Sequence, residues 1–182
     1  MVDPHVLIIP SWYPTPAKAL SGIFIQHQAR ALSERLNRVG VIYCARGRMG
    51  RSAQTLTSLS HGFPEVIRVQ WHPWRIWLLR QAWLHQYQKA YHSYRQMYGP
   101  PDLLHAHGYF GGVAARWIAQ QDNLPYIVTE HSTGILSGQI TANYRILIKK
   151  VYRDATMLIA VWKPLANAMR RISASNKVVV VP

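Results

Sequence analysis

Two short stretches of this sequence carry histidines, and the second adds an acid and hydroxyls, residue types that move protons or bind polar ligands. His105 and His107 end one apolar run, and Glu130, His131 and Ser132 follow another. Because an imidazole titrates near neutral pH, His131 could act as a general base or donate a hydrogen bond to a ligand hydroxyl. The same loop could instead be a Ser/Thr helix cap with an incidental histidine, and the residues alone leave both interpretations open.

The pair His105 and His107 has the spacing of a possible metal site. Residues i and i+2 of a strand share a face, so both imidazoles point the same way. No His/Cys/Asp cluster at ligand spacing supplies a third ligand. We therefore favour a His105 that is hydrogen-bonded within the sheet and a His107 that lines the adjacent crevice, and we expect no metal and no cofactor.

A further candidate is the loop at residues 11–22, which ends in Ser21-Gly22 before a helical pattern. Serine is a favoured N-cap, and glycine allows a ligand to approach the backbone, so a phosphate could dock at this helix start. The alternative is a helix cap and nothing more. The loop is not G-x-G-x-x-G, which disfavours a nicotinamide-dependent dehydrogenase, and the lack of G-x-S-x-G disfavours a Ser-His-acid hydrolase.

Positive charge is the unusual property of the composition. Lys and Arg number 21, of which 15 are Arg, against 7 Asp and Glu, so the net charge is +14. Such a surface attracts nucleic acid, anionic lipid headgroups or phosphorylated small molecules. A charge run is more often a solvated face, but an Arg/Gly loop suits anions and Trp beside Arg suits a membrane interface. The candidate contacts are Arg46, Arg48, Arg51, Trp74, Trp77 and Arg80.

These residues must be positioned by an alternation of strands and helices. Strands are predicted at 5–10, 38–45, 65–71, 102–107, 126–129, 157–161 and 177–181, and helices at 23–36, 76–98, 109–121, 142–153 and 164–172. Residues 46–62 and 130–138 are predicted to be loops. Strands separated by helices indicate βαβ units, so the expected fold is an α/β, Rossmann-like doubly wound parallel sheet with helices on both faces. Ligands of such sheets bind beyond the carboxyl ends of the strands.

Several protein classes are disfavoured. Cys44 is the only cysteine, which excludes an internal disulfide framework and a four-Cys zinc site. No apolar run approaches the roughly 20 residues of a membrane span, and the N-terminus lacks the pattern of a signal peptide. We therefore expect a cytoplasmic protein. The final strand, KVVVVP, runs straight to the end of the chain, which suggests a fragment cut at a linker.

Three blocks, in chain order, resemble the N-terminal domain of family-4 glycosyltransferases of the GT-B fold. They are PSWYPTPAKALSGIFIQHQARAL, PDLLHAHGYFGGVAARWIAQQDNLPYIVTEHST, and IAVWKPLANAMRR with the closing KVVVVP. The resemblance implies that residues 1–182 are one Rossmann-like, acceptor-binding domain, half of a GT-B fold. A second domain, absent from this chain, would bind the nucleotide-sugar. Family members commonly carry a small polar residue where this chain has Trp162.

The resemblance also implies a reaction and a set of contacts. The complete enzyme would transfer a sugar from a nucleotide-sugar to a glycan or lipid-linked acceptor, with retention and without metal, and this half alone would be inactive. His131 would lie near the reacting sugar, Gly22 would approach the donor diphosphate, and His107 with Gly108 would line the cleft. The neighbouring residues expected to bind acceptor or donor are Ser21, Glu130 and Ser132.

Two other functions remain open at this stage. The net charge of +14 would suit a nucleic-acid-binding module, although the chain has no recognisable motif of that kind and we expect no specific nucleic-acid partner. A scaffold domain could also keep the fold and lose catalysis, because fold alone does not guarantee activity. For the glycosyltransferase, the basic surface would favour peripheral contact with anionic lipid on the inner face of the membrane.

Overall fold

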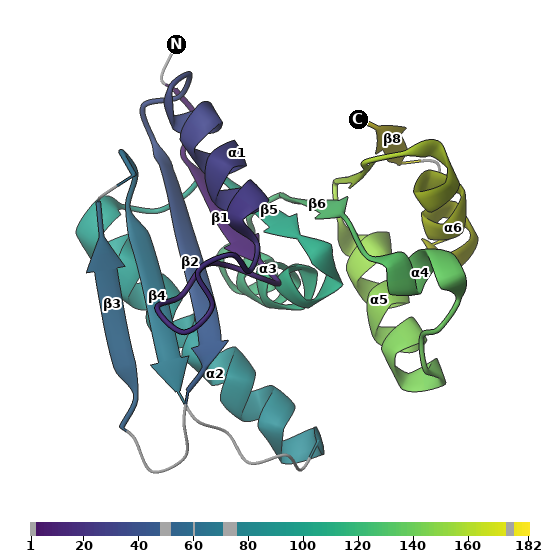
Figure 1. Cartoon of the computed structure of the whole chain (residues 1–182), viewed down its shortest axis with the longest axis horizontal. Helices are drawn as coiled ribbons and strands as arrows, with labels where there is room; N and C mark the ends of the chain where they lie inside the picture. The colour runs from purple at the N-terminus through teal and green to yellow at the C-terminus, as the bar shows by residue number, and fades with distance from the viewer. Residues whose placement is uncertain (1–2, 48–51, 60, 71–75, 174–176) are drawn as a thin grey trace. The chain divides into compact units, whose positions relative to one another are not determined.

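The computed structural model describes residues 3–47, 52–59, 61–70, 76–173 and 177–182, with backbone only for residues 46 and 76–80. The chain forms two compact units, Met1–Asp102 and Leu103–Pro182 (Figure 1). Each unit contains both strands and helices. The candidate histidines belong to the second unit, and the Ser21-Gly22 loop belongs to the first.

The first unit contains four strands in the order β3-β4-β2-β1. The strands are β1 (Val6–Pro10), β2 (Val39–Arg46), β3 (Gln54–Ser58) and β4 (Glu65–Gln70). Strands β1, β2 and β4 are parallel, as the predicted mostly parallel sheet requires. Strand β1 is nearly continuous in apolar residues, as predicted for a strand covered on both faces, and every residue of it is buried. Strand β3 pairs antiparallel with β4.

Strand β3 corrects the prediction that residues 46–62 form a loop. Its sequence, QTLTS, alternates weakly, and four of its five residues are exposed. A short polar strand of this kind is typical of a sheet edge, where little burial is available to mark it in the sequence. Its register against β4, from Gln54 opposite Val69 to Ser58 opposite Glu65, is what identifies it.

Helix α2 (Ile76–Tyr98) has the bounds that its apolar stripe predicts. Tyr87, Ala90 and Tyr94 are buried, as a stripe of period 3.6 facing a sheet requires. Tyr94 packs against Gly40 of β2, where a Cβ atom would lie 2.0 Å from the tyrosine hydroxyl oxygen. The helix and the sheet of the first unit therefore meet at a site that only glycine fits.

Helix α1 (Ile23–Ser33) buries a different face from the predicted one. The periodicity of residues 23–36 predicts a face marked by Ile23 and Gln26/His27 on successive turns, with Phe24, Ala31 and Leu32 as further apolar members. Of these apolar members, Phe24 is 41% exposed and Ala31 also faces solvent. The buried residues of the helix are Ile25, Gln26 and Ala29. A buried glutamine breaks the apolar pattern, so hydrophobicity alone points to the wrong face.

A buried polar cluster explains the burial of Gln26. Its Nε2 donates to Oε1 of Glu65 over 3.0 Å, and the Tyr13 hydroxyl donates to the same oxygen. His61 Nδ1 lies 3.0 Å from Oε2 of Glu65. Because a buried carboxylate needs such partners, this cluster ties α1 and the loop after β1 to the start of β4.

Glycine is required at position 22, where α1 begins. Gly22 is the N-cap residue with φ +69°, and a Cβ atom there would lie 2.3 Å from the Trp12 carbonyl oxygen. The prediction that Ser21 caps the helix is wrong, because the cap position is Gly22 and its cap carries no side-chain hydrogen bond. The turn and the contact with Trp12 account for the glycine without a ligand.

Gly22→Ala is expected to lower the free energy of unfolding by about 3 kcal/mol, because it adds a backbone clash to the cost of a left-handed conformation. Gly62→Ala is the matched control. Gly62 has φ +87°, but a Cβ atom there would have no heavy atom within 4 Å, so only the conformational cost of about 1–2 kcal/mol applies. Urea denaturation measures both. Equal losses in the two variants would contradict the packing at Trp12.

The second unit contains four parallel strands in the order β5-β6-β7-β8. They are β5 (Leu103–His107), β6 (Tyr126–Glu130), β7 (Met157–Ala160) and β8 (Val178–Val180). The helices are α3 (Gly108–Asp122), α4 (Thr133–Ser137), α5 (Ala142–Asp154) and α6 (Lys163–Ser173). The predicted Rossmann-like α/β class, with a mostly parallel sheet, is confirmed.

Helix α4 is a second correction, since residues 130–138 are predicted to be a loop. The helix has only five residues and buries only Ile135. One turn with a single apolar anchor is too short to produce a periodic signal in the sequence. It ends at Gly138, whose φ of +71° is the left-handed conformation that commonly stops a helix.

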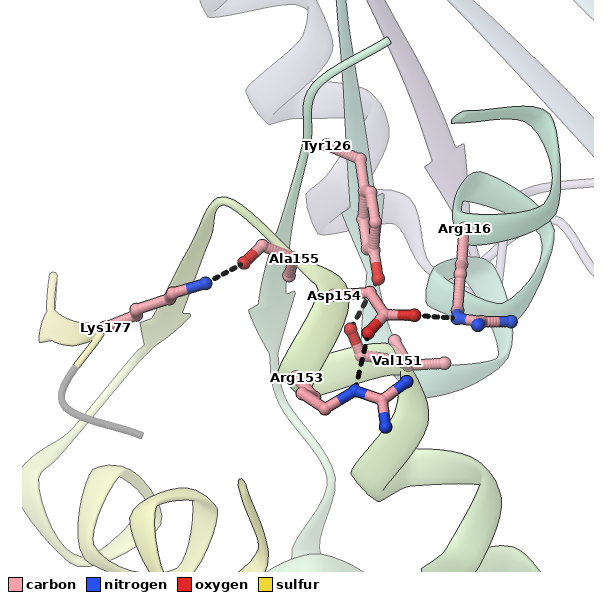
Figure 2. A network of polar contacts seen from close by, with 7 residues as sticks. All are labelled: Arg116, Tyr126, Val151, Arg153, Asp154, Ala155 and Lys177. Atoms are coloured by element: carbon pink, nitrogen blue, oxygen red, sulfur yellow. Dashed lines mark hydrogen bonds and ion pairs between the residues drawn. The ribbon is translucent and has the colours of Figure 1, made fainter. Parts of the chain in front are cut away.

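An ion-pair network joins α3 to the end of α5 (Figure 2). Asp154 accepts hydrogen bonds of 2.7 Å from Nε of Arg153 and from Nε of Arg116. The guanidinium groups of Arg153 and Arg116 hold the pKa of Asp154 below its usual value, and the hydrogen bond from Arg153 makes the largest contribution. Lys177 Nζ donates to the Ala155 carbonyl over 3.2 Å, so the turns before β7 and β8 are also connected.

Candidate histidine site

The candidate site lies where β5 and β6 end. In the parallel register of these strands, His107 stands opposite Thr129, so their carboxyl ends meet at one edge of the second unit. Helix α3 starts at once with Gly108, whose φ of +75° allows the sharp turn out of β5. His131 directly follows β6. His107 and His131 therefore both lie at the carboxyl ends of parallel strands.

His105 and His107 share a face of β5, as predicted, and their ring centroids are 4.3 Å apart. His105 Nε2 lies 2.8 Å from the Thr129 hydroxyl of the neighbouring strand. This is the hydrogen-bonded His105 within the sheet that the sequence favours over a metal ligand. The described residues hold no group of three or more His, Cys, Asp or Glu that could bind a metal ion.

His107 is only 2% exposed. It therefore does not line an open crevice of this chain, which corrects the prediction made for it. Its Nδ1 lies 3.2 Å from Nε2 of His131. The two ring planes are nearly parallel, differing by 12°, and their centroids are 5.4 Å apart.

Burial keeps all three imidazoles of this histidine cluster (His105, His107 and His131) neutral. Burial lowers the pKa of His105 to about 4, with a further contribution from His131. Burial and then the other two imidazoles hold the pKa of His107 well below its ordinary value, and burial lowers the pKa of His131. At pH 7 the cluster can donate and accept hydrogen bonds but carries no charge.

The stability of the chain should therefore fall in acid. Above pH 6.5, the ordinary histidine pKa, both folded and unfolded imidazoles are neutral. Below it the unfolded chain binds protons first, so the lowered pKa of His105 alone costs about 3 kcal/mol by pH 4. Urea titrations at pH 7 and pH 4.5 measure the loss, and His105→Gln, which keeps an amide near Thr129, should reduce it. The same pH slope in both proteins would contradict this assignment.

Glu130 is fully buried and holds the loop that carries His131. Its Oε1 accepts hydrogen bonds of 2.9 Å from the backbone N–H groups of His131 and Ser132, and its Oε2 accepts one of 2.8 Å from the Tyr152 hydroxyl. Burial raises the pKa of the carboxyl group, and these bonds oppose that shift. The carboxylate thus faces the protein, although the sequence predicts it as a ligand contact.

Two residues of this arrangement are missing from the sequence prediction. Tyr152 belongs to the buried stripe of α5 and gives no sign in the sequence that its hydroxyl serves Glu130. Thr129 is a strand residue, and only the register against β5 reveals its contact with His105. Ser132 occupies the N-cap position of α4 without a side-chain cap hydrogen bond, so the simple cap interpretation is incomplete.

Of the six predicted anion-contact residues, three belong to described elements. Arg48, Arg51 and Trp74 lie outside the described residues. The backbone places Arg46 at the end of β2, and Trp77 and Arg80 in the first turns of α2. No described helix is long and apolar enough to cross a membrane.

A separate hollow of about 180 Å³ lies among α4, α5 and α6. Ile135, Leu136 and Ile172 give it apolar walls, and Arg145 and Arg171 add positive charge. Ile146, the residue after Arg145 in α5, is 58% exposed. The hollow therefore combines apolar and cationic groups, and α5 carries no acid before Asp154.

The chain belongs to Glycosyltransferase Family 4, whose family model matches residues 21–182. This confirms the resemblance drawn from the three sequence blocks. A search among curated proteins finds no match.

Solved structures of GT-B glycosyltransferases share the fold. A sucrose-phosphate synthase from Thermosynechococcus elongatus has a TM-score of 0.67 at 18% identity, over 98% of this chain and 48% of its own. HepE of Anabaena in complex with UDP has a TM-score of 0.62 at 18% identity, and the match covers 97% of this chain and 43% of the HepE chain. The catalytic domain of starch synthase IV from Arabidopsis thaliana, bound to ADP and acarbose, has a TM-score of 0.61 at 13% identity. That match covers 98% of this chain and 51% of the starch synthase chain. The chain thus spans about half the length of each.

Proposed function

We propose that this chain is the acceptor-binding half of a retaining glycosyltransferase, which transfers a sugar from a nucleotide-sugar to a glycan or lipid-linked acceptor. Family membership over residues 21–182 supports this proposal. So does the coverage of about half of neighbours whose structures contain UDP or ADP. A second half would bind the nucleotide-sugar, and no metal or cofactor would take part.

The observation that carries the proposal is the way His131 is held at the end of β6. A ring nitrogen of His107 lies 3.2 Å from its Nε2, and Glu130 accepts a hydrogen bond from its backbone N–H. A neutral imidazole fixed from two sides suits a hydroxyl of the transferred sugar, because it adds polarity without repelling the oxocarbenium character of a glycosyl transition state. His131 is therefore proposed to touch the reacting sugar.

Contact with an anionic membrane is part of the same proposal. The net charge of +14 supports it, and so does helix α5, which exposes Arg145, Ile146, Lys149 and Lys150. Each cation near an anionic surface contributes about 1 kcal/mol. Binding to vesicles should rise with the content of anionic lipid and fall with salt, whereas equal binding to neutral and anionic vesicles would exclude the proposed membrane contact.

Strong retention on DNA near physiological salt would instead favour the alternative that this chain is a nucleic-acid-binding module.

Calorimetry with nucleotide-sugars tests the division of labour between the two proposed halves. The 182-residue chain should show little affinity for UDP-, ADP- or GDP-sugars, whereas the native protein that contains it should bind one of them. The reason is that an acceptor-binding half supplies few of the contacts to the nucleotide. Tight binding of a nucleotide-sugar by the 182-residue chain alone would contradict the proposal.

A further inference from the structure

The contact between His107 and His131 constrains where both protons sit. Both imidazoles are held neutral by burial, and two neutral rings that share a hydrogen bond must divide the roles of donor and acceptor. The atoms in contact are Nδ1 of His107 and Nε2 of His131, 3.2 Å apart. Each ring has one N–H, so the choice of donor decides the tautomer of both histidines.

The surroundings of His107 favour one choice. Its Nε2 is buried and has no hydrogen-bond partner among the described residues. If His131 donated, the proton of His107 would have to sit on that Nε2 as a buried, unpaired N–H. If His107 donates from Nδ1, its Nε2 is only an unpaired acceptor. Buried N–H groups without a partner are rarer than unpaired acceptors, so the second arrangement is the less costly one.

We propose that His107 is a positioning residue: it donates its Nδ1–H to Nε2 of His131 and thereby holds His131 as the Nδ1–H tautomer. His131 then presents an N–H at Nδ1 and has its Nε2 lone pair engaged. It is a hydrogen-bond donor to its ligand and not a general base. The role of this donor in glycosyl transfer rests on the proposed function, but the tautomer does not.

The neighbouring contacts keep this pair in place. The ring of His105 lies against the ring of His107 and is itself tied to Thr129 over 2.8 Å. On the other side, Glu130 fixes the backbone N–H of His131 over 2.9 Å. Rotation of either ring would break the hydrogen bond between them and leave a second buried nitrogen without a partner, so one tautomer should dominate.

The tautomers can be read from the 182-residue chain by NMR, with ¹⁵N-labelled histidine and long-range ¹H–¹⁵N correlations at pH 7. His131 and His107 are both expected to carry their proton on Nδ1. Substitution of each histidine by glutamine assigns the signals, and exposed His92 serves as the reference. A proton on Nε2 of His131 in the wild-type chain would overturn the proposal.

Two substitutions separate a tautomer effect from a loss of packing. In His107→Leu, His131 should shift toward the Nε2–H form that imidazole prefers in water. In His107→Asn, the side-chain amide can donate from nearly the Nδ1 position, so the Nδ1–H form of His131 should return. An unchanged tautomer in a folded His107→Leu chain would also overturn the proposal, and if that variant unfolds, the wild-type and Asn spectra still decide.

The spectra do not depend on transferase activity, so they distinguish this inference from the proposed function. In the native protein, His107→Leu should lower kcat at least 10-fold with little change in KM, and His107→Asn should recover most of the rate. Correct tautomers without any glycosyl transfer would leave the positioning role in place and remove the proposed reaction. An active transferase in which His131 carries its proton on Nε2 would support the proposed reaction and overturn the positioning role of His107.

Discussion

Glu130→Ala is expected to lower the free energy of unfolding of the second unit by about 3–5 kcal/mol. The substitution leaves two backbone N–H groups, of His131 and Ser132, and the Tyr152 hydroxyl without their shared acceptor in a buried place. Each buried donor without a partner costs about 1–3 kcal/mol. Burial disfavours the charged carboxylate and raises the pKa of Glu130. This cost of burying the charge offsets part of the stabilisation from the three hydrogen bonds, so the expected loss is smaller than the sum of the three contributions.

Urea denaturation at pH 7 measures the effect, and two controls divide it. Glu130→Gln keeps the volume and one acceptor oxygen for the backbone N–H groups, so it should cost much less than alanine. Tyr152→Phe removes only one hydrogen bond and should cost about 1 kcal/mol. An alanine variant as stable as the wild-type chain would mean that the carboxylate does not hold this loop.

His131→Ala should reduce kcat of the native protein by about 10²–10⁴-fold, the usual contribution of a positioned acid, base or hydrogen-bond donor. The substitution also removes the partner of Nδ1 of the buried His107, so the free energy of unfolding should fall by about 1–3 kcal/mol, and the rate is compared at a temperature where the variant is fully folded. The control is His92→Ala, which removes an exposed imidazole from α2 and should leave the rate unchanged. A normal rate with normal stability in His131→Ala would remove this residue from the site.

Much of the fold could be predicted because burial produces periodic patterns in the sequence. Helix α2 carries a stripe long enough to define both of its ends, and β1 is apolar throughout. The face of α1 could not be predicted, because Gln26 is buried by a carboxylate 39 positions away in the sequence. Strand β3 was not predicted because an exposed edge strand needs no apolar residues.

The positions of the histidines at strand ends were predictable, but their contacts were not. The apolar runs before them predicted strands that end there, and the i, i+2 spacing predicted the shared face of His105 and His107. The contact between His107 and His131 depends on the β5–β6 register, which the sequence does not encode locally. The inward direction of Glu130 depends on Tyr152, which belongs to a different element.

The anomeric configuration of the product tests the central proposal most directly. The native protein that contains this chain would be incubated with the nucleotide-sugar that it binds and with a glycan or lipid-linked acceptor, and the new linkage followed by ¹H NMR. We predict transfer with retention of configuration, abolished to background by His131→Ala. Inversion, or no transfer from any nucleotide-sugar that the protein binds, would contradict the assignment of this chain to a retaining glycosyltransferase.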